Sequence, residues 1–202
     1  MTEQNTTPGA ARRVVVAEDE SLIRLDIVET LRDNGFESSY EERWVKLKAG
    51  PIPLWFPNAP GRVRAVKLHD LHHLVTGYAT DWTGEAEIGA WEIASGCGSF
   101  AWAWALNASA MPIGLVLAPG KLFRAWVRGR RSRNFYHGRT EVDATLLARP
   151  VRTVRSEMGL DDPPSRATLF DAATFAVACV LATAFVLAPT AAVVALIVAL
   201  RS

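Results

Sequence analysis

The chain has 202 residues, which is enough for one domain of ordinary size with its own core, or for one domain with appended segments. It carries 22 basic and 21 acidic residues, so the formal net charge of +1 gives no general attraction for nucleic acid. Half of the residues are hydrophobic and the mean hydropathy is +0.10, which is high for a purely soluble protein. The two cysteines, Cys97 and Cys179, lie far apart among small apolar residues, so we expect buried thiols and no disulfide.

The first segment, residues 1–13, is polar and contains Pro8 and Gly9. We expect this N-terminal segment to be disordered. It has no apolar h-region, so we expect no signal peptide and place the soluble part of the protein in a reducing cytoplasm.

Residues 14–37 begin with a short run of valines, and an acidic cluster containing Glu18 and Asp19 follows it. Leucine and valine then recur at helical spacing until Gly35 supplies a stop signal. This segment resembles the opening of a response-regulator receiver domain, particularly the RNA-binding antiterminator type, in which the acidic pair holds magnesium. The resemblance ends near Glu37, and a single strand cannot build a parallel sheet because its backbone groups would lack partners. We therefore expect a truncated receiver remnant without phosphorelay activity, and we favour a solvated acidic turn over a metal site.

Beyond the receiver-like segment, the sequence favours helices. Residues 41–49 could form a short helix, and the proline-rich stretch 50–61 is expected to break all regular structure. Residues 62–76 are typical of a helix, and Gly77 suits a left-handed cap at its end. A second helix, rich in small residues that let a neighbouring helix approach closely, is expected to start near Glu85.

Residues 93–120 carry no charge and are long enough for a membrane span. The alternative is a buried core helix, a turn at Met111 and Pro112, and then a second helix. We favour the buried alternative because the helix that precedes this stretch carries three glutamates.

Three histidines fall within the five residues His69-Asp70-Leu-His72-His73. Since residues four apart share one face of a helix, His69 and His73 can converge on one ion. Asp70 can reach the rim of the same site or orient a ligand imidazole, and Glu85 lies at the start of the next helix. Two imidazoles with one or two carboxylates suit a divalent Zn²⁺ or Fe²⁺ ion and leave open positions for water or substrate. The alternative is that these histidines are structural, which we expect of His72.

Residues 121–139 contain seven basic residues and no acidic one, with aromatic residues interleaved. Arg124, Arg128 and Arg131 fall on one predicted helical stripe with Trp126 beside it, a pattern typical of a helix lying on anionic lipid. An ordinary solvated face is the alternative. RNA binding would use the same residues, but no nucleic-acid module pattern accompanies them, so we expect no nucleic-acid partner.

Residues 161–171 are predicted to be a linker, and residues 172–200 carry no charge over 29 positions. As one helix the apolar segment would be about 43 Å long, more than a bilayer core requires. Pro189 could kink a tilted span or divide the segment into a hairpin. We favour a C-terminal anchor or a bent membrane-embedded hairpin, with the arginines upstream keeping the domain on the cytoplasmic side.

Residues 40–160 resemble the ubiquinone-biosynthesis "Coq-four" family. The family carries His-Asp-x-x-His, then eleven residues, then Glu, and the spacing from His69 to Glu85 agrees with that pattern. The segments RGRRSRNFY (128–136) and LLARPVRTVRSEMGL (146–160) are also similar to the family's basic segment and closing helix. The resemblance implies a metal site built from His69, Asp70, His73 and Glu85.

The resemblance also implies a function: a metal-dependent step on a polyprenyl quinone precursor, understood in the family as oxidative decarboxylation at C1 of the ring. It places the protein at the cytoplasmic face of the inner membrane, peripheral or anchored by its C-terminus, with quinone-biosynthesis enzymes as potential partners. The alternative is a non-enzymatic scaffold that binds lipid or isoprenoid intermediates. A signalling role through the receiver-like segment is disfavoured because that segment is truncated.

The predicted fold is mostly α. We expect a helical bundle with a membrane-associated C-terminal helix or hairpin and an orphan N-terminal strand and helix. Two features depart from the family pattern: the receiver remnant stands where longer members have additional helices, and the C-terminal apolar segment is outside the family's core.

Overall fold

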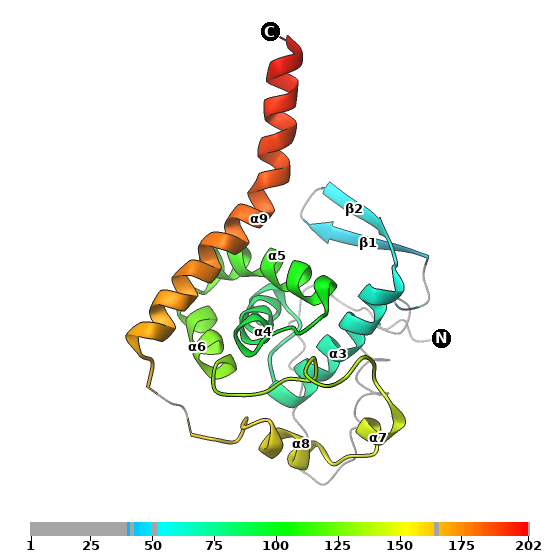
Figure 1. The fold of residues 1–202 in the computed structure, drawn as a ribbon, viewed down its shortest axis with the longest axis vertical. Coiled ribbons are helices and arrows are strands. Elements are labelled where there is room, and N and C mark those ends of the chain that lie inside the picture. Colours follow the sequence, from blue (N-terminus) through cyan, green and yellow to red (C-terminus); the bar gives the residue numbers. More distant parts are fainter. Residues whose placement is uncertain (1–39, 41–42, 50–51, 164–165, 202) are drawn as a thin grey trace, which may run out of the picture.

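The computed structural model describes residues 40, 43–49, 52–163 and 166–201 (Figure 1). This part of the chain is mostly helical, which confirms the predicted fold class. The predictions for residues 1–13 and 14–37 lie outside the described residues. The elements are β1 (Trp44–Ala49), β2 (Ile52–Pro57), α3 (Pro60–Thr76), α4 (Trp82–Ser95), α5 (Ala101–Leu117), α6 (Pro119–Gly129), α7 (Ala144–Leu147), α8 (Val151–Glu157) and α9 (Leu169–Arg201).

Strands β1 and β2 form an antiparallel pair in which Trp44 lies opposite Pro57 and Ala49 lies opposite Ile52. The predicted short helix over 41–49 and irregular path over 50–61 are therefore wrong. The sequence WVKLKA alternates apolar and basic residues from its second position onward, which is the period of a strand. The prolines of β2 do not prevent pairing, because both strands of a two-stranded sheet are edge strands and edges tolerate proline.

Helices α3 and α4 carry the histidines and the glutamates. Helix α3 ends as predicted: Gly77 has a φ of 77°, and its N–H donates to the carbonyl of His73. Helix α4 begins three residues earlier than expected because the Asp81 side chain accepts a hydrogen bond from the Gly84 N–H at 2.8 Å and caps the helix. This cap leaves Glu85 in the first helical turn.

The centre of the domain is α4, which contacts α3, α5 and α6. Trp91 is completely buried on it and donates its indole N–H to the Ser132 hydroxyl at 2.8 Å. The small residues of α4 let a neighbouring helix approach closely, as predicted: a Cβ on Gly89 would lie 3.3 Å from the carbonyl oxygen of Asn107 on α5. Glycines on the neighbouring helices also allow close packing. A Cβ on Gly129 of α6 would lie 2.4 Å from the Trp91 carbonyl oxygen, and one on Gly114 of α5 would lie 2.4 Å from the Ala86 methyl.

The uncharged stretch 93–120 is divided between the end of α4, a loop and the single helix α5. The predicted turn at Met111 and Pro112 is wrong, because α5 continues through Pro112. The break comes instead at Ala118, where the following Pro119 disfavours helical geometry and opens α6. Burial is confirmed for one face of α5, whereas the opposite face exposes large apolar residues such as Val116.

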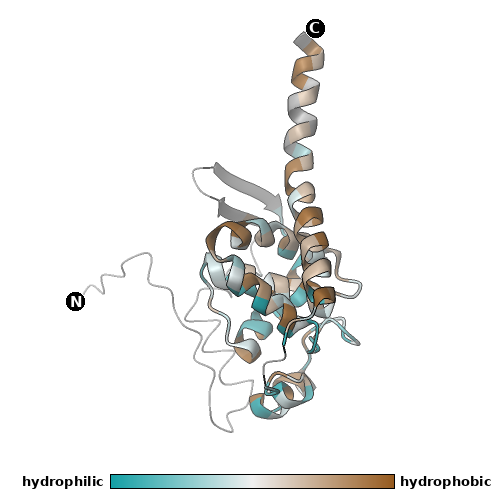
Figure 2. Ribbon diagram, turned by 90° about the vertical axis from the view of Figure 1, so that its left-hand side faces the viewer, coloured by the Kyte–Doolittle hydropathy of each residue, from teal (hydrophilic) through white to brown (hydrophobic). Residues whose placement is uncertain are grey.

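Helix α9 is one continuous helix of 33 residues with Pro189 inside it, so the apolar segment is a single helix rather than a hairpin. It begins at Leu169, within the predicted linker. Its first half lies along α5 and α6, and its second half projects beyond the domain (Figure 1). Hydrophobic residues recur along its length (Figure 2), and Leu169–Pro189 is long and apolar enough to cross a membrane.

Candidate metal centre

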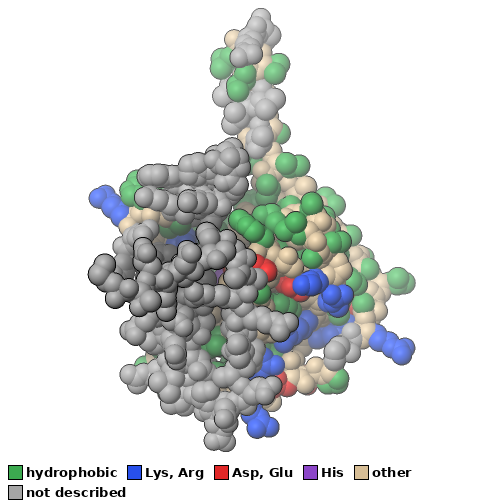
Figure 3. Space-filling view, turned by 180° about the vertical axis from the view of Figure 1, so that it is seen from behind, with side chains coloured by type: hydrophobic (Ala, Val, Ile, Leu, Met, Phe, Trp, Pro, Cys, Tyr) green, Lys and Arg blue, Asp and Glu red, His purple; other side chains and the backbone are tan. Residues whose placement is uncertain are grey.

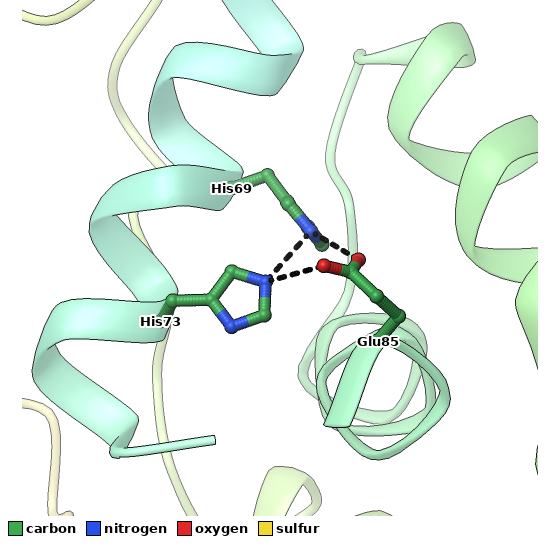
Figure 4. A group of neighbouring side chains, drawn as sticks. All are labelled: His69, His73 and Glu85. Carbon is green, nitrogen blue, oxygen red and sulfur yellow. Dashed lines mark hydrogen bonds and ion pairs between the residues drawn. The ribbon is translucent and has the colours of Figure 1, made fainter. Parts of the chain in front are cut away.

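Three side chains from two helices meet at one point (Figure 4). The Nε2 atoms of His69 and His73 are 3.2 Å apart. Glu85 places one carboxylate oxygen 3.2 Å from Nε2 of His69 and the other 3.3 Å from Nε2 of His73. Among the described residues, this group has the composition and spacing to hold a metal ion.

Local structure explains why these residues converge. His69 and His73 are one turn apart on α3, and their rings stand edge to face with centroids 4.8 Å apart. The Asp81 cap starts α4 so that Glu85 projects from its first turn toward α3. The predicted pairing of two imidazoles with a carboxylate from the next helix is therefore realised.

Hydrogen bonds on the far side of each ring fix which nitrogen faces the centre. Nδ1 of His73 lies 3.0 Å from the carbonyl oxygen of Tyr78, which can only accept, so this nitrogen carries the proton. Nδ1 of His69 lies 2.9 Å from Glu92 and donates to its carboxylate. Both Nε2 atoms are therefore available to coordinate an ion, which is the usual arrangement of metal-binding histidines.

The charges around the centre favour a cation. Burial alone would lower the pKa of His69, but the carboxylates of Glu92 and Glu85 outweigh it and raise that pKa well above its ordinary value. Burial alone would raise the pKa of Glu85, but hydrogen bonds with His69 and His73 hold it well below its usual range. The lone pairs of the two Nε2 atoms face each other at 3.2 Å and would repel unless a proton or a metal ion lies between them. A metal ion that binds at this point would therefore displace a proton.

Two imidazole nitrogens and one carboxylate suit zinc or ferrous iron, and three protein ligands leave coordination positions for water or substrate. The His73 side chain is nearly buried, with 4% of its surface exposed, whereas Glu85 is 33% exposed. The group is therefore reachable from the side of Glu85.

Asp70, the fourth predicted ligand, is not a member of this group. Its buried carboxylate accepts a hydrogen bond from the hydroxyl of Tyr40. Burial raises the pKa of Asp70 to about 6, against the opposing effect of His69. A role for Asp70 as a ligand stays a prediction.

His72 was predicted to be structural, and it is completely buried among aromatic side chains. Its Nε2 accepts the Phe135 backbone N–H at 2.9 Å, so Nδ1 carries the proton and donates to Glu92 at 2.6 Å. Burial lowers the pKa of His72, which is consistent with a neutral ring.

Glu92 is the residue that sequence reasoning missed. It is completely buried and lies seven residues after Glu85, on the same face of α4. That spacing, together with a lone acidic residue in the apolar stretch AWEIAS, is the signal that could have identified it.

The predicted lipid-facing stripe is not a single surface. Helix α6 ends at Gly129, so Arg131 lies beyond it and binds Asp171 at 2.7 Å. Arg128 donates to the carbonyl of Thr76, while Arg124 is exposed. Figure 3 shows Lys and Arg side chains at several separate places on the face that it presents.

The prediction that Trp126 contacts lipid is wrong, because α9 covers it. Trp126 is 5% exposed, its ring lies 5.9 Å from that of Phe175, and its indole N–H donates to Thr174. An aromatic residue between basic residues can face a neighbouring helix as readily as a bilayer, and the spacing alone does not distinguish the two.

Comparisons of the chain with family models, curated proteins and solved structures find no match. The resemblance to the "Coq-four" family therefore rests on the sequence motifs quoted above.

Proposed function

We propose that this chain is a metal-dependent protein of ubiquinone biosynthesis that acts on a polyprenyl quinone precursor. The observation that carries the proposal is the convergence of His69, His73 and Glu85, with both imidazoles held so that Nε2 faces the centre. The motif spacing shared with the "Coq-four" family supplies the reaction class, oxidative decarboxylation at C1 of the ring. The assignment of this reaction class is an inference from the likeness to that family.

The chain's own residues would bind and orient the reactants. His69, His73 and Glu85 would hold the ion, while the Tyr78 carbonyl and Glu92 keep the Nδ1 protons in place. When bound, zinc would supply Lewis-acid chemistry, and iron would add redox chemistry with dioxygen. The partly exposed side of Glu85 is where a substrate would approach.

A quinone precursor with a polyprenyl tail remains in or near the bilayer, so its enzyme needs a membrane contact. The long apolar helix α9 supports such a contact. The exposed end of α5 adds to it, since Val116 is 82% and Leu117 57% exposed beside the basic residues that open α6. We place the protein at the cytoplasmic face of the inner membrane, with quinone-biosynthesis enzymes as the expected partners.

The test is elemental analysis and product formation with the full chain in nanodiscs. We compare the wild type with His73→Ala and with His137→Ala, a control at an exposed histidine that lies against the Ser95 carbonyl. The wild type and the control should carry about one zinc or iron per chain and convert a polyprenyl precursor with a ring carboxyl. His73→Ala should lose both metal and product while keeping its helical content and membrane binding.

Metal and product retained by His73→Ala would contradict the proposal. Loss of folding together with the metal, and no product from the wild type, would favour the alternative of a scaffold with a structural metal that presents isoprenoid intermediates.

A further inference from the structure

Glu92 is the most highly connected buried side chain of the site. One carboxylate oxygen, Oε1, accepts from Nδ1 of His69 at 2.9 Å and from Nδ1 of His72 at 2.6 Å. The other, Oε2, accepts from the Tyr136 hydroxyl at 3.1 Å and from the side-chain amide of Asn107. A single carboxylate thus joins α3, α4, α5 and the segment after α6.

The direction of each hydrogen bond follows from the chemistry of the partners. His72 uses Nε2 to accept a backbone N–H from Phe135, so only its Nδ1 can donate to Glu92. An ionised carboxylate only accepts, so Nδ1 of His69 must also carry its proton. Four donors therefore fill the four lone-pair positions of Glu92, and the network is complete without solvent.

We propose that Glu92 is a positioning residue of the metal centre: its Oε1 atom holds His69 in the Nδ1–H form and aims Nε2 at His73 and Glu85. The inference rests on the proposed metal function and deepens it. Glu92 does not touch the ion position, because the imidazole of His69 lies between the two. A carboxylate behind a ligand imidazole typically changes metal affinity by about 10–100-fold.

A purely structural role would make a different prediction. The two oxygens of Glu92 divide their partners, with both histidines on Oε1 and with Asn107 and Tyr136 on Oε2. A substitution that removes a donor to Oε2 tests whether the hydrogen-bond network stabilises the fold. A substitution that neutralises Glu92, whose Oε1 accepts from both histidines, tests whether its charge acts on the metal centre. The site therefore offers a matched pair of substitutions within one network.

The first variant is Glu92→Gln, which keeps the size of the side chain and one carbonyl acceptor for the two histidines. Its new N–H₂ group can donate to the Tyr136 oxygen or to an inverted Asn107 amide. The substitution therefore removes the negative charge behind His69 without leaving an obvious void. The matched control is Tyr136→Phe, which removes a donor to Oε2 and leaves the contact between Glu92 and His69 in place.

The experiment measures Zn²⁺ affinity of the full chain by competition with a chromophoric chelator. Side-chain ¹⁵N spectra of the zinc-loaded protein report which nitrogen of His69 is protonated. Glu92→Gln should weaken zinc binding about tenfold and shift the His69 Nδ1 resonance, while Tyr136→Phe should change neither. Equal effects of the two variants, or no effect of Glu92→Gln, would overturn the inference alone. Absence of zinc binding by the wild-type chain would overturn the proposed function, and the inference with it.

Discussion

Two helices of this protein carry charged or ionisable residues at nearly the same spacing, with different outcomes. On α3, His69 and His73 turn their Nε2 atoms toward one point 3.2 Å apart. On and after α6, Arg124, Arg128 and Arg131 occur at intervals of four and three residues, yet no two of them share a partner among the contacts described above. The two histidines form part of a candidate metal site, whereas the three arginines do not converge.

Helix length and the position of the partner explain the difference. Helix α3 continues to Thr76, so both histidines keep the same face, whereas α6 ends at Gly129 and leaves Arg131 beyond the helix. The histidines also meet a carboxylate from the neighbouring helix. Regular spacing therefore predicts convergence only where the helix extends past both residues and a neighbouring element supplies an opposite charge.

The largest expected effect separates two glutamates of α4. Glu85→Gln should weaken zinc binding by at least about 100-fold, because a neutral amide replaces a ligand carboxylate. Glu87→Gln should leave the affinity unchanged, because the cations that act on Glu87 are Lys121 and Arg124. Chelator competition measures both. Equal losses would mean that general negative charge on α4, rather than the geometry of Glu85, attracts the ion.

The candidate metal centre was predictable because the convergence of its side chains depends on local geometry. A helical turn brings His69 and His73 together whatever the rest of the fold, and the loop between α3 and α4 is short enough to place Glu85 beside them. The cap at Gly77 follows from the same local rules.

The missed features depend on tertiary contacts. The role of Glu92 depends on its hydrogen bonds with residues of α3, of α5 and of the segment that contains Tyr136. No local sequence pattern specifies those neighbours. The passage of α5 through Pro112 likewise depends on packing, which offsets the lost backbone hydrogen bond. Trp126 was assigned to lipid because the sequence did not reveal that α9 would cover it.

The end of α6 supplies the second test. Gly129→Ala should lower the free energy of unfolding by up to about 3 kcal/mol, because the new Cβ would meet the backbone carbonyl of Trp91. Gly120→Ala in the same helix is the control. Its Cβ would meet only the flexible guanidinium of Arg124 at 3.7 Å, so improved helix propensity should make it neutral or stabilising. Denaturant unfolding in detergent measures both, and equal destabilisation would contradict the close approach of α6 to α4.

The third test concerns the partner of Arg131. Asp171 is buried in the first turn of α9, where its carboxylate binds Arg131 at 2.7 Å and accepts the Thr168 backbone N–H at 2.8 Å. Asp171→Asn should lower the free energy of unfolding by about 2 kcal/mol, because a neutral amide replaces the carboxylate that Arg131 binds. Denaturant unfolding of the wild type and the variant in detergent measures the loss, and unchanged stability of Asp171→Asn would contradict this assignment.

The smallest expected effect tests the row of arginines directly. Arg124 is exposed, so Arg124→Gln should lower the preference for anionic vesicles about fivefold, the equivalent of ~1 kcal/mol per basic residue near a membrane surface. Arg131→Gln should leave that preference nearly unchanged, because Asp171 already engages the guanidinium. The measurement is the ratio of partition coefficients for vesicles with and without phosphatidylserine, in which the apolar contribution of α9 cancels. An equal decrease in both variants would mean that the two arginines face the lipid together, and the contrast with α3 would then disappear.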